Sequence, residues 1–138
     1  MLTVEHLSVK YGAFHALRDV SLSISEGTVV SIVGANGAGK TTLINAISGL
    51  LRPSDGRIGF DGQDLTRMEG HAIAAAGIAQ VPEGRKLFPD MSVYENLLLG
   101  GYTARARSRR AETMEEVFQL FPILRQRRDQ LARTLSGG

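Results

Sequence analysis

The sequence contains no cysteine and no tryptophan, and aromatic residues make up only 6% of its 138 residues. Without cysteine the chain can form neither a disulfide framework nor a thiolate metal site, which fits a reducing compartment. Its longest apolar runs, "AIAAAGIA" and "LLLGG", are far shorter than the roughly 20 residues of a membrane-spanning helix. The N-terminus has no basic stretch followed by an apolar one, so no secretory signal is predicted. We therefore expect a soluble, cytoplasmic chain.

Glycine, in contrast, is abundant. Sixteen of the 138 residues are glycine, and they fall in short clusters without a repeating period. This pattern predicts tight turns and close backbone approaches, and it excludes a collagen-like repeat. With 43% hydrophobic residues, the chain is long enough to bury one core. One domain, or a piece of one, is the expectation.

Charge is unevenly distributed along the chain. Residues 101–138 carry eight arginines against four acidic residues, a net charge of +4, whereas residues 1–100 carry eight basic and ten acidic residues, a net charge of −2. A basic segment can bind nucleic acid or anionic lipid. Helical spacing, however, places Ala111, Met114, Phe118 and Phe121 on one stripe and most arginines on the opposite face. No aromatic residues alternate with the arginines, so the pattern favours a solvated helix face over a nucleic-acid surface.

The first third of the chain has strand patterns. "LTVEHLSVKY" reads as a strand, and "VSLSIS" alternates with Val20, Leu22 and Ile24 on one face before a turn at Glu26-Gly27. "TVVSIV", residues 28–33, is apolar at nearly every position and predicts a strand buried on both faces. "IAQV", residues 78–81, predicts another short buried strand.

Helix and turn signals follow. A helix is expected from Lys40 to about Ser48, with Leu43, Ile44 and Ile47 toward the core, and another from Met68 to Ala76 that ends at Gly77. Asp55-Gly56 and Asp61-Gly62 predict hairpin-type turns. Ser92 and Glu95 have the spacing of a capping box and begin a helix. Helical structure is expected to continue to about Phe121, where Pro122 should break it.

The chemistry is carried by "GANGAGKT", residues 34–41, which fits the pattern G-x-x-x-x-G-K-[ST] between a predicted strand and a predicted helix. Gly37 and Gly39 lack a Cβ, so backbone N–H groups can surround a phosphate without a clash. The start of the following helix adds unsatisfied N–H groups and the positive end of its dipole. We expect Lys40 to bind β/γ-phosphate oxygens, Thr41 to offer its hydroxyl to Mg²⁺, and Thr42 to reach the α-phosphate.

Together, "GANGAGKTT" and the later "LSGG" resemble the ATP-binding subunits of ABC transporters, over residues 4–138. The resemblance implies an α/β P-loop fold with an antiparallel β-subdomain and first core strand (1–33), a P-loop and incomplete parallel core (34–91) and a helical subdomain (92–138). It implies ATP and Mg²⁺ as cofactors and adenine stacking on Tyr11. The ATP-binding residues implied are Tyr11, Gly34, Asn36, Gly37, Ala38, Gly39, Lys40, Thr41 and Thr42.

The "LSGG" motif has its own implied role. By resemblance, Leu135, Ser136, Gly137 and Gly138 cap the γ-phosphate of the nucleotide held by a second subunit in a head-to-tail dimer.

The stretch "VPEGRKLF" followed by "ENL" and "GG" is similar to the ATP-binding subunits of branched-chain amino-acid importers. Most ABC proteins have a glutamine where this chain has Glu83. We assign that loop role, with contact to Mg²⁺ and the attacking water, to Glu83, alongside Lys40 as a catalytic residue; the alternative is a solvated loop carboxylate. Gln80 is interpreted as structural. Glu83 can bind Mg²⁺ but cannot donate a hydrogen bond as glutamine does.

The resemblance implies ATP-driven import of branched-chain or related amino acids, with transmembrane permease subunits and a second ATP-binding subunit as partners. It implies a peripheral position on the cytoplasmic face of the cell membrane and no nucleic-acid partner. An importer of urea or short amides is the nearest alternative. A DNA-acting ABC ATPase would predict heptad segments or aromatic residues among the basic ones, which the sequence lacks.

A nucleotide-binding fragment without turnover is a third alternative. No apolar strand ending in an acidic pair follows "LSGG", and His6, His15 and His71 precede it and are interpreted as ordinary surface or strand histidines. We therefore expect residues 1–138 to be the N-terminal part of an ATPase, to hydrolyse no ATP alone, and to fold marginally because a sheet edge stays unpaired.

Overall fold

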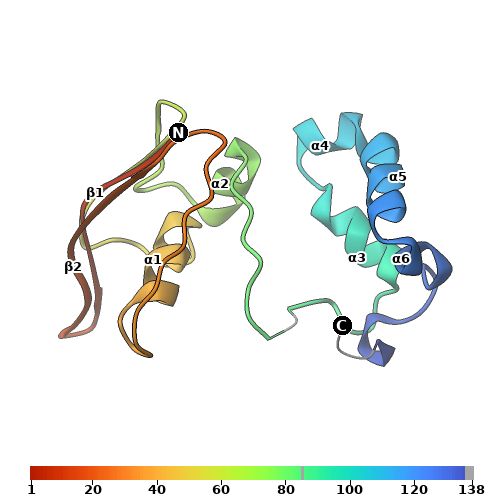
Figure 1. Cartoon of the computed structure of the whole chain (residues 1–138), viewed down its shortest axis with the longest axis horizontal. Coiled ribbons are helices and arrows are strands. Elements are labelled where there is room, and N and C mark those ends of the chain that lie inside the picture. Colours follow the sequence, from red (N-terminus) through yellow and green to blue (C-terminus); the bar gives the residue numbers. More distant parts are fainter. Residues whose placement is uncertain (85, 136–138) are drawn as a thin grey trace. The chain divides into compact units, whose positions relative to one another are not determined.

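The computed structural model describes residues 1–84 and 86–135. The chain divides into two compact units, Met1–Gln80 and Val81–Gly138, each described here by itself. Figure 1 shows the strands and helices α1 and α2 in the first unit and helices α3 to α6 in the second.

The first unit is built on an antiparallel sheet with strand order β2-β1-β3-β4. Strand β1 (Leu2–Tyr11) forms a hairpin with β2 (Phe14–Ile24) and pairs on its other edge with β3 (Asp55–Phe60), which turns into the short β4 (Gln63–Asp64). Val4, Leu7 and Val9 of β1 are buried, because this central strand turns its apolar face into the core. The two strand predictions at the N-terminus are thereby confirmed.

Two helices cover one face of this sheet. Helix α1 (Lys40–Ile47) and helix α2 (Gly70–Ala76) bury Leu43, Ala46 and Ile73 against the strands. The helices approach closely where α1 ends and α2 begins: a Cβ at Gly49, which has φ +75°, would lie 2.7 Å from Ile73 Cδ1. Both predicted helices are confirmed, and Gly77 ends α2 in the left-handed conformation.

Within α1 the predicted core face needs one correction. Leu43 is buried and Ile47 packs against the core, but Ile44 is 43% exposed. Ala46 takes the buried position instead. In 3.6-residue periodicity, Leu43, Ala46 and Ile47 form one stripe, and Ile44 lies at its edge.

The predicted core strands are wrong for the described residues. Neither residues 28–33 nor residues 78–81 form a strand, and Val29, Val33 and Val81 are 96%, 89% and 96% exposed. A strand exists only through hydrogen bonds to a neighbour, and no strand within residues 1–84 or 86–135 pairs with either segment. The two segments have the apolar composition of buried strands, but composition alone does not provide a neighbouring strand to pair with.

The two Asp-Gly pairs behave differently. Asp61-Gly62 is the predicted turn: it joins Phe60 of β3 to Gln63 of β4 with positive φ at both residues. Asp55-Gly56 is not a turn but the beginning of β3. Gly56 has φ +87°, and a Cβ there would overlap the carbonyl of His6 in β1. Glycine is needed at this position because β3 lies against the β1 backbone there, close to an irregularity in the pairing of the two strands.

The second unit is helical in its described part. Helix α3 (Val93–Gly100) begins with the predicted capping box: Glu95 N–H donates to Ser92 Oγ (3.2 Å), and Ser92 N–H donates to Glu95 Oε2 (2.7 Å). Helices α4 (Ala104–Ser108), α5 (Arg110–Leu120) and α6 (Pro122–Gln126) follow, and then a 3₁₀ turn η1 (Ala132–Thr134). The chain returns to the start of α3, where Val93 N–H donates to Gln130 O (2.9 Å).

One prediction about this unit is confirmed and another needs correction. The predicted break is present: α5 ends at Leu120, and Pro122 begins the separate helix α6, because proline is favoured at the first position of a helix. The apolar stripe of α5 consists of Met114, Val117 and Phe118, whereas Ala111 is exposed and Phe121, beyond the end of α5, is 57% exposed. The arginines of α4, α5 and α6 are mostly exposed, as predicted. No helix in the described part of the chain is long and apolar enough to cross a membrane.

Candidate phosphate-binding site

The loop of residues 34–39 connects the segment 28–33 to the first residue of α1. Lys40 begins the helix, and its ammonium turns back under this loop, where Nζ donates to the carbonyls of Gly34 (2.6 Å) and Ala35 (2.7 Å). Ala38 N–H donates to Ala35 O (3.2 Å), which tightens the loop further. The backbone therefore folds around the cation that the sequence predicts as the phosphate ligand.

The N-terminus of α1 is suited to an anion. Its N-cap is Gly39 with φ +91°, no side chain caps the helix, and its first turn contains no acidic residue. The first N–H groups of a helix lack intrahelical partners and carry the positive end of the helix dipole. Lys40 adds a full positive charge at the same place. The start of α1 thus combines hydrogen-bond donors and a cation without a competing carboxylate.

Gly39 also closes a narrow gap to the sheet. A Cβ at this position would lie 2.6 Å from Leu17 Cδ2 and 2.8 Å from Ala16 O, both in β2. A Cβ at Gly37, which has φ +83°, would meet nothing within 4 Å. Gly39 is therefore required by packing as well as by its backbone, whereas Gly37 is required by its backbone alone.

These features fit the triphosphate of ATP. The loop 34–39 and the uncapped start of α1 would hold the phosphates, Lys40 would supply the counter-charge, and Thr41 and Thr42 follow directly in the first turn. A bound nucleotide would supply its phosphoanhydride bond as the reactive group. Within residues 1–84 and 86–135 no group of three or more His, Asp or Glu side chains could hold a metal by itself, so Mg²⁺ would need phosphate oxygens in addition to protein ligands such as Thr41.

Tyr11 lies at the end of the β1–β2 hairpin. It is 49% exposed and pairs with Phe14 across the turn. Leu17, which contacts the position of Gly39, is opposite Val9, two residues before Tyr11. The hairpin therefore carries an exposed aromatic ring at the end of β1, while its other strand, β2, borders the phosphate loop. His15 lies beside it, and desolvation together with Lys10 and Arg18 lowers the pKa of this histidine.

The other predicted site residues belong to the second unit or beyond it. Glu83 is exposed in a bend of the Val81–Gly138 unit. Leu135 follows η1 in an extended conformation and is half-buried. Ser136, Gly137 and Gly138 lie outside the described residues.

Asn96, for which no role was predicted, organises the loop before α3. Its Oδ1 accepts from Phe88 N–H (2.9 Å), and its Nδ2 donates to Phe88 O (3.1 Å) and Ser92 O (2.9 Å). One amide group thus pairs with both backbone groups of Phe88 and leaves the Leu87 and Phe88 side chains 52% and 57% exposed. Asn96 is the asparagine of "ENL", but only the loop geometry shows that its amide binds the backbone of Phe88.

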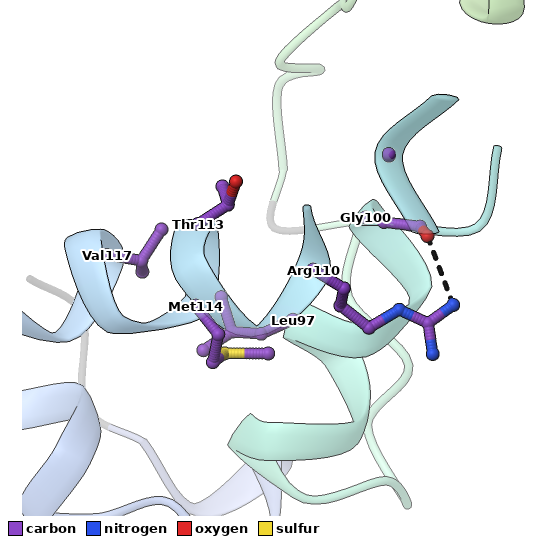
Figure 2. Close-up of a pocket in the computed structure, with 8 residues that line it drawn as sticks. Leu97, Gly100, Arg110, Thr113, Met114 and Val117 are labelled. Atoms are coloured by element: carbon purple, nitrogen blue, oxygen red, sulfur yellow. Dashed lines mark hydrogen bonds between the residues drawn. The ribbon is translucent and has the colours of Figure 1, made fainter. Parts of the chain in front are cut away.

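The second unit also contains a mostly apolar hollow. It has a volume of about 260 Å³ and is lined by Leu97 of α3, by Met114 and Val117 of α5, and by Arg110 at one end (Figure 2). The Arg110 guanidinium donates from Nη2 to Gly101 O (3.2 Å). The hollow therefore offers an apolar wall with a cation at its rim.

Comparison with known proteins decides the family. Residues 17–138 match the family model described as ABC transporter, which covers most of the chain. The chain belongs to the ABC transporter family. The predicted resemblance is confirmed, and so is the P-loop ABC ATPase fold.

Individual ABC proteins agree on the fold but not on the cargo. The chain is 39% identical over 138 residues to the high-affinity branched-chain amino acid transport ATP-binding protein BraG of Pseudomonas aeruginosa. It is 35% identical over 143 residues to the lipopolysaccharide export system ATP-binding protein LptB of Haemophilus influenzae. Each alignment covers 100% of this chain but only 59% or 58% of the relative.

Among solved structures, a nucleotide-free ATP-binding cassette from an ABC transporter superposes with a TM-score of 0.78 at 32% identity. The superposition covers 99% of this chain and 59% of that chain. The chain thus spans a little under three-fifths of the length of each of these three proteins.

Proposed function

We propose that the protein is an ATP-binding subunit that powers transport through a membrane partner, and that its cargo is branched-chain or related amino acids. The observation that carries the ATP part is the position of Lys40: its ammonium is held by the loop carbonyls of Gly34 and Ala35 at the uncapped start of α1. The amino-acid part is supported by the 39% identity to BraG, a branched-chain amino acid transport protein, whereas LptB serves lipopolysaccharide export.

In this proposal the residues of the chain have distinct tasks. The backbone N–H groups of residues 37–42 and the Lys40 ammonium bind the phosphates and neutralise charge that develops on them. Thr41 orients Mg²⁺, Tyr11 stacks on adenine, and Glu83 orients the metal and the attacking water. Leu135 to Gly138 complete the nucleotide site of a second ATP-binding subunit. For the intact domain we propose the division 1–33, 34–91 and 92–138 given by the sequence.

The membrane partner would contact the second unit. The loop pinned by Asn96 exposes Leu87 and Phe88, and the hollow between α3 and α5 adds an apolar wall with Arg110 at its rim. We propose that a permease segment with an apolar side chain and a nearby carboxylate binds here. Binding to the permease through this surface would hold the ATP-binding subunit at the cytoplasmic face of the cell membrane as a peripheral protein.

The test of ATP binding uses the intact protein that contains this chain. Binding of a fluorescent ATP analogue is measured for wild type, Lys40→Ala and Arg67→Ala, which removes an exposed cation from the same unit. We expect Lys40→Ala to lose binding and turnover while Arg67→Ala keeps both. Equal affinity for Lys40→Ala and wild type would contradict the nucleotide site.

The cargo is tested separately in the source cells. Uptake of labelled leucine, isoleucine and valine is compared with uptake of urea in cells that carry the Lys40→Ala allele. We expect the amino-acid uptake to fall and the urea uptake to stay. The reverse pattern would assign the protein to urea or amide import, and no change in either would reject import of both classes.

A further inference from the structure

Gln80, the last residue of the first unit, makes both of its side-chain hydrogen bonds to a single helix. Its Nε2 donates to Asn45 Oδ1 (3.0 Å), and its Oε1 accepts from Ser48 Oγ (2.5 Å). Asn45 and Ser48 are three residues apart on one face of α1 and its C-cap, and all three residues are half-buried. Segment 78–81 has no strand partner among the described residues, so this contact fixes its end to α1.

The same helix carries the phosphate site at its other end. Lys40 and Thr41 are in its first turn, and Asn45 follows Lys40 by five residues, a rise of about 7.5 Å along the axis. Over this short distance a packed helix moves as a rigid element. A change in position at the start of α1 therefore reaches Asn45 and Ser48 directly.

The chain from Gln80 to Glu83 is short and stiff. Three residues span at most about 11 Å even when extended. Pro82 fixes its own φ and restricts Val81 to extended conformations. Fixing Gln80 therefore limits how far along the chain the Glu83 backbone can move away from α1.

We propose that Gln80 is a positioning residue: through Asn45 and Ser48 it ties the segment that carries Glu83 to the helix that holds the nucleotide phosphates. This inference rests on the proposed ATPase function and adds a residue to it. The side-chain hydrogen bonds of Gln80 go to α1 and its C-cap, so Gln80 acts through α1 and the backbone. Its amide is suited to this role because it can donate and accept at once, whereas an apolar side chain of equal length would leave Asn45 and Ser48 without that partner.

The first measurement is ATP hydrolysis by the intact protein. We compare wild type, Gln80→Met, which keeps the side-chain length, and Gln63→Met, which alters an exposed glutamine of β4. We expect Gln80→Met to lower kcat on the order of three- to ten-fold with little change in ATP affinity. Gln63→Met should equal wild type.

A double variant separates positioning from general stability. If Gln80 acts through Glu83, Gln80→Met should have no further effect on kcat in a Glu83→Ala background. Independent, multiplicative losses in the double variant would overturn the inference, and so would an unchanged kcat in Gln80→Met.

A nucleotide-independent arm distinguishes this inference from the ATPase proposal. Urea unfolding is measured for Gln80→Met, Asn45→Ala and the double variant, which form a thermodynamic cycle. We expect the double variant to shift the unfolding midpoint by less than the sum of the single shifts. Additive shifts would show that the contact carries no coupling and would overturn the inference. A third outcome is possible: the unfolding midpoints show coupling between Gln80 and Asn45, but the intact protein binds no ATP. That result would reject the ATPase function and the positioning role for Glu83, while the contact of Gln80 with α1 would stay established.

Discussion

His6 Nδ1 lies 2.6 Å from Asp19 Oδ1 across strands β1 and β2, and both residues have a left-handed backbone, with φ +50° and +51°. Each is at an irregularity of the hairpin register, and serine hydroxyls accept their backbone N–H groups: His6 N–H donates to Ser21 Oγ (2.9 Å) and Asp19 N–H to Ser8 Oγ (3.1 Å). Positive φ is unfavourable for residues with a Cβ. The ion pair and the two serine contacts stabilise this double bulge.

This pair predicts a pH-dependent contribution to stability. The Asp19 carboxylate, which hydrogen-bonds to His6, raises the pKa of His6 above its ordinary value of 6.5, with smaller contributions from Glu5 and Asp55. A raised pKa means that the stabilisation is fully present below pH 6.5 and is lost as the pH rises through the folded-state value. Asp19→Asn should lower the pKa of His6 in an NMR titration. Its unfolding midpoint should differ from wild type mainly at low pH; a constant difference from pH 5.5 to 8.5 would contradict this.

The capping box predicts the opposite direction of pH dependence in the second unit. The backbone N–H of Ser92 and then its hydroxyl lower the pKa of Glu95 below its ordinary value of 4.5. The stabilisation is therefore present above pH 4.5 and is lost as the pH falls through the folded-state value. Ser92→Ala should reduce the free energy of unfolding at pH 7 by about 1 kcal/mol.

Ser108→Ala is a matched control, because Ser108 Oγ donates within α4 (2.9 Å to Arg105 O) and caps no N-terminus. Chemical denaturation followed by circular dichroism measures both variants. Equal loss of stability in the two would show that the capping box has no special role.

The two glycines of the phosphate loop should respond differently to alanine. Gly39→Ala places a Cβ 2.6 Å from Leu17 Cδ2, whereas Gly37→Ala meets nothing within 4 Å, and both have positive φ. We expect Gly39→Ala to be the more destabilising by about 1–3 kcal/mol, because packing strain adds to backbone strain. Thermal unfolding of the two variants measures this difference. A greater loss in Gly37→Ala would contradict the position of the loop against β2.

Tyr11 should contribute to nucleotide affinity through its ring. Tyr11→Ala should weaken ATP binding by about three- to ten-fold, and Tyr11→Phe should keep the wild-type affinity, because stacking requires the ring and not the hydroxyl. Tyr102→Ala removes a similarly exposed tyrosine from the second unit and should have no effect. Loss of affinity in Tyr11→Phe would indicate a hydrogen bond from the hydroxyl instead of stacking.

Glu83 should determine the magnesium requirement. Replacing its carboxylate by the amide in Glu83→Gln weakens metal binding, so a higher Mg²⁺ concentration should be needed for half-maximal hydrolysis by the intact protein. Asp90→Asn, at an exposed loop carboxylate of the same unit, is the control. Identical Mg²⁺ titrations for Glu83→Gln and wild type would support the alternative that Glu83 is a solvated loop carboxylate.

Local signals in the sequence were sufficient for much of the fold. The spacing of Ser92 and Glu95 predicted the start of α3, and Asp61-Gly62 predicted the turn after β3, because each depends on backbone contacts within four residues. The G-x-x-x-x-G-K-[ST] pattern predicted the loop of residues 34–39 and the start of α1 at Lys40, because both also depend on local backbone contacts. Local spacing did not predict that Pro122 would begin a helix, since proline fits both a helix stop and a first turn.

Other features depended on residues far apart in the sequence. Residues 28–33 have the composition of a buried strand, but pairing is a property of two segments, and the composition of one cannot reveal whether a neighbour is present. The contact of Gln80 with Asn45 and Ser48 spans more than 30 residues and has no sequence pattern. The sequence by itself determined which residues could bind phosphate and where helices begin, because those depend on local backbone chemistry. Only the tertiary structure decided which apolar faces are covered and that the Gln80 amide pairs with Asn45 and Ser48, because burial and side-chain pairing require partners brought together by folding.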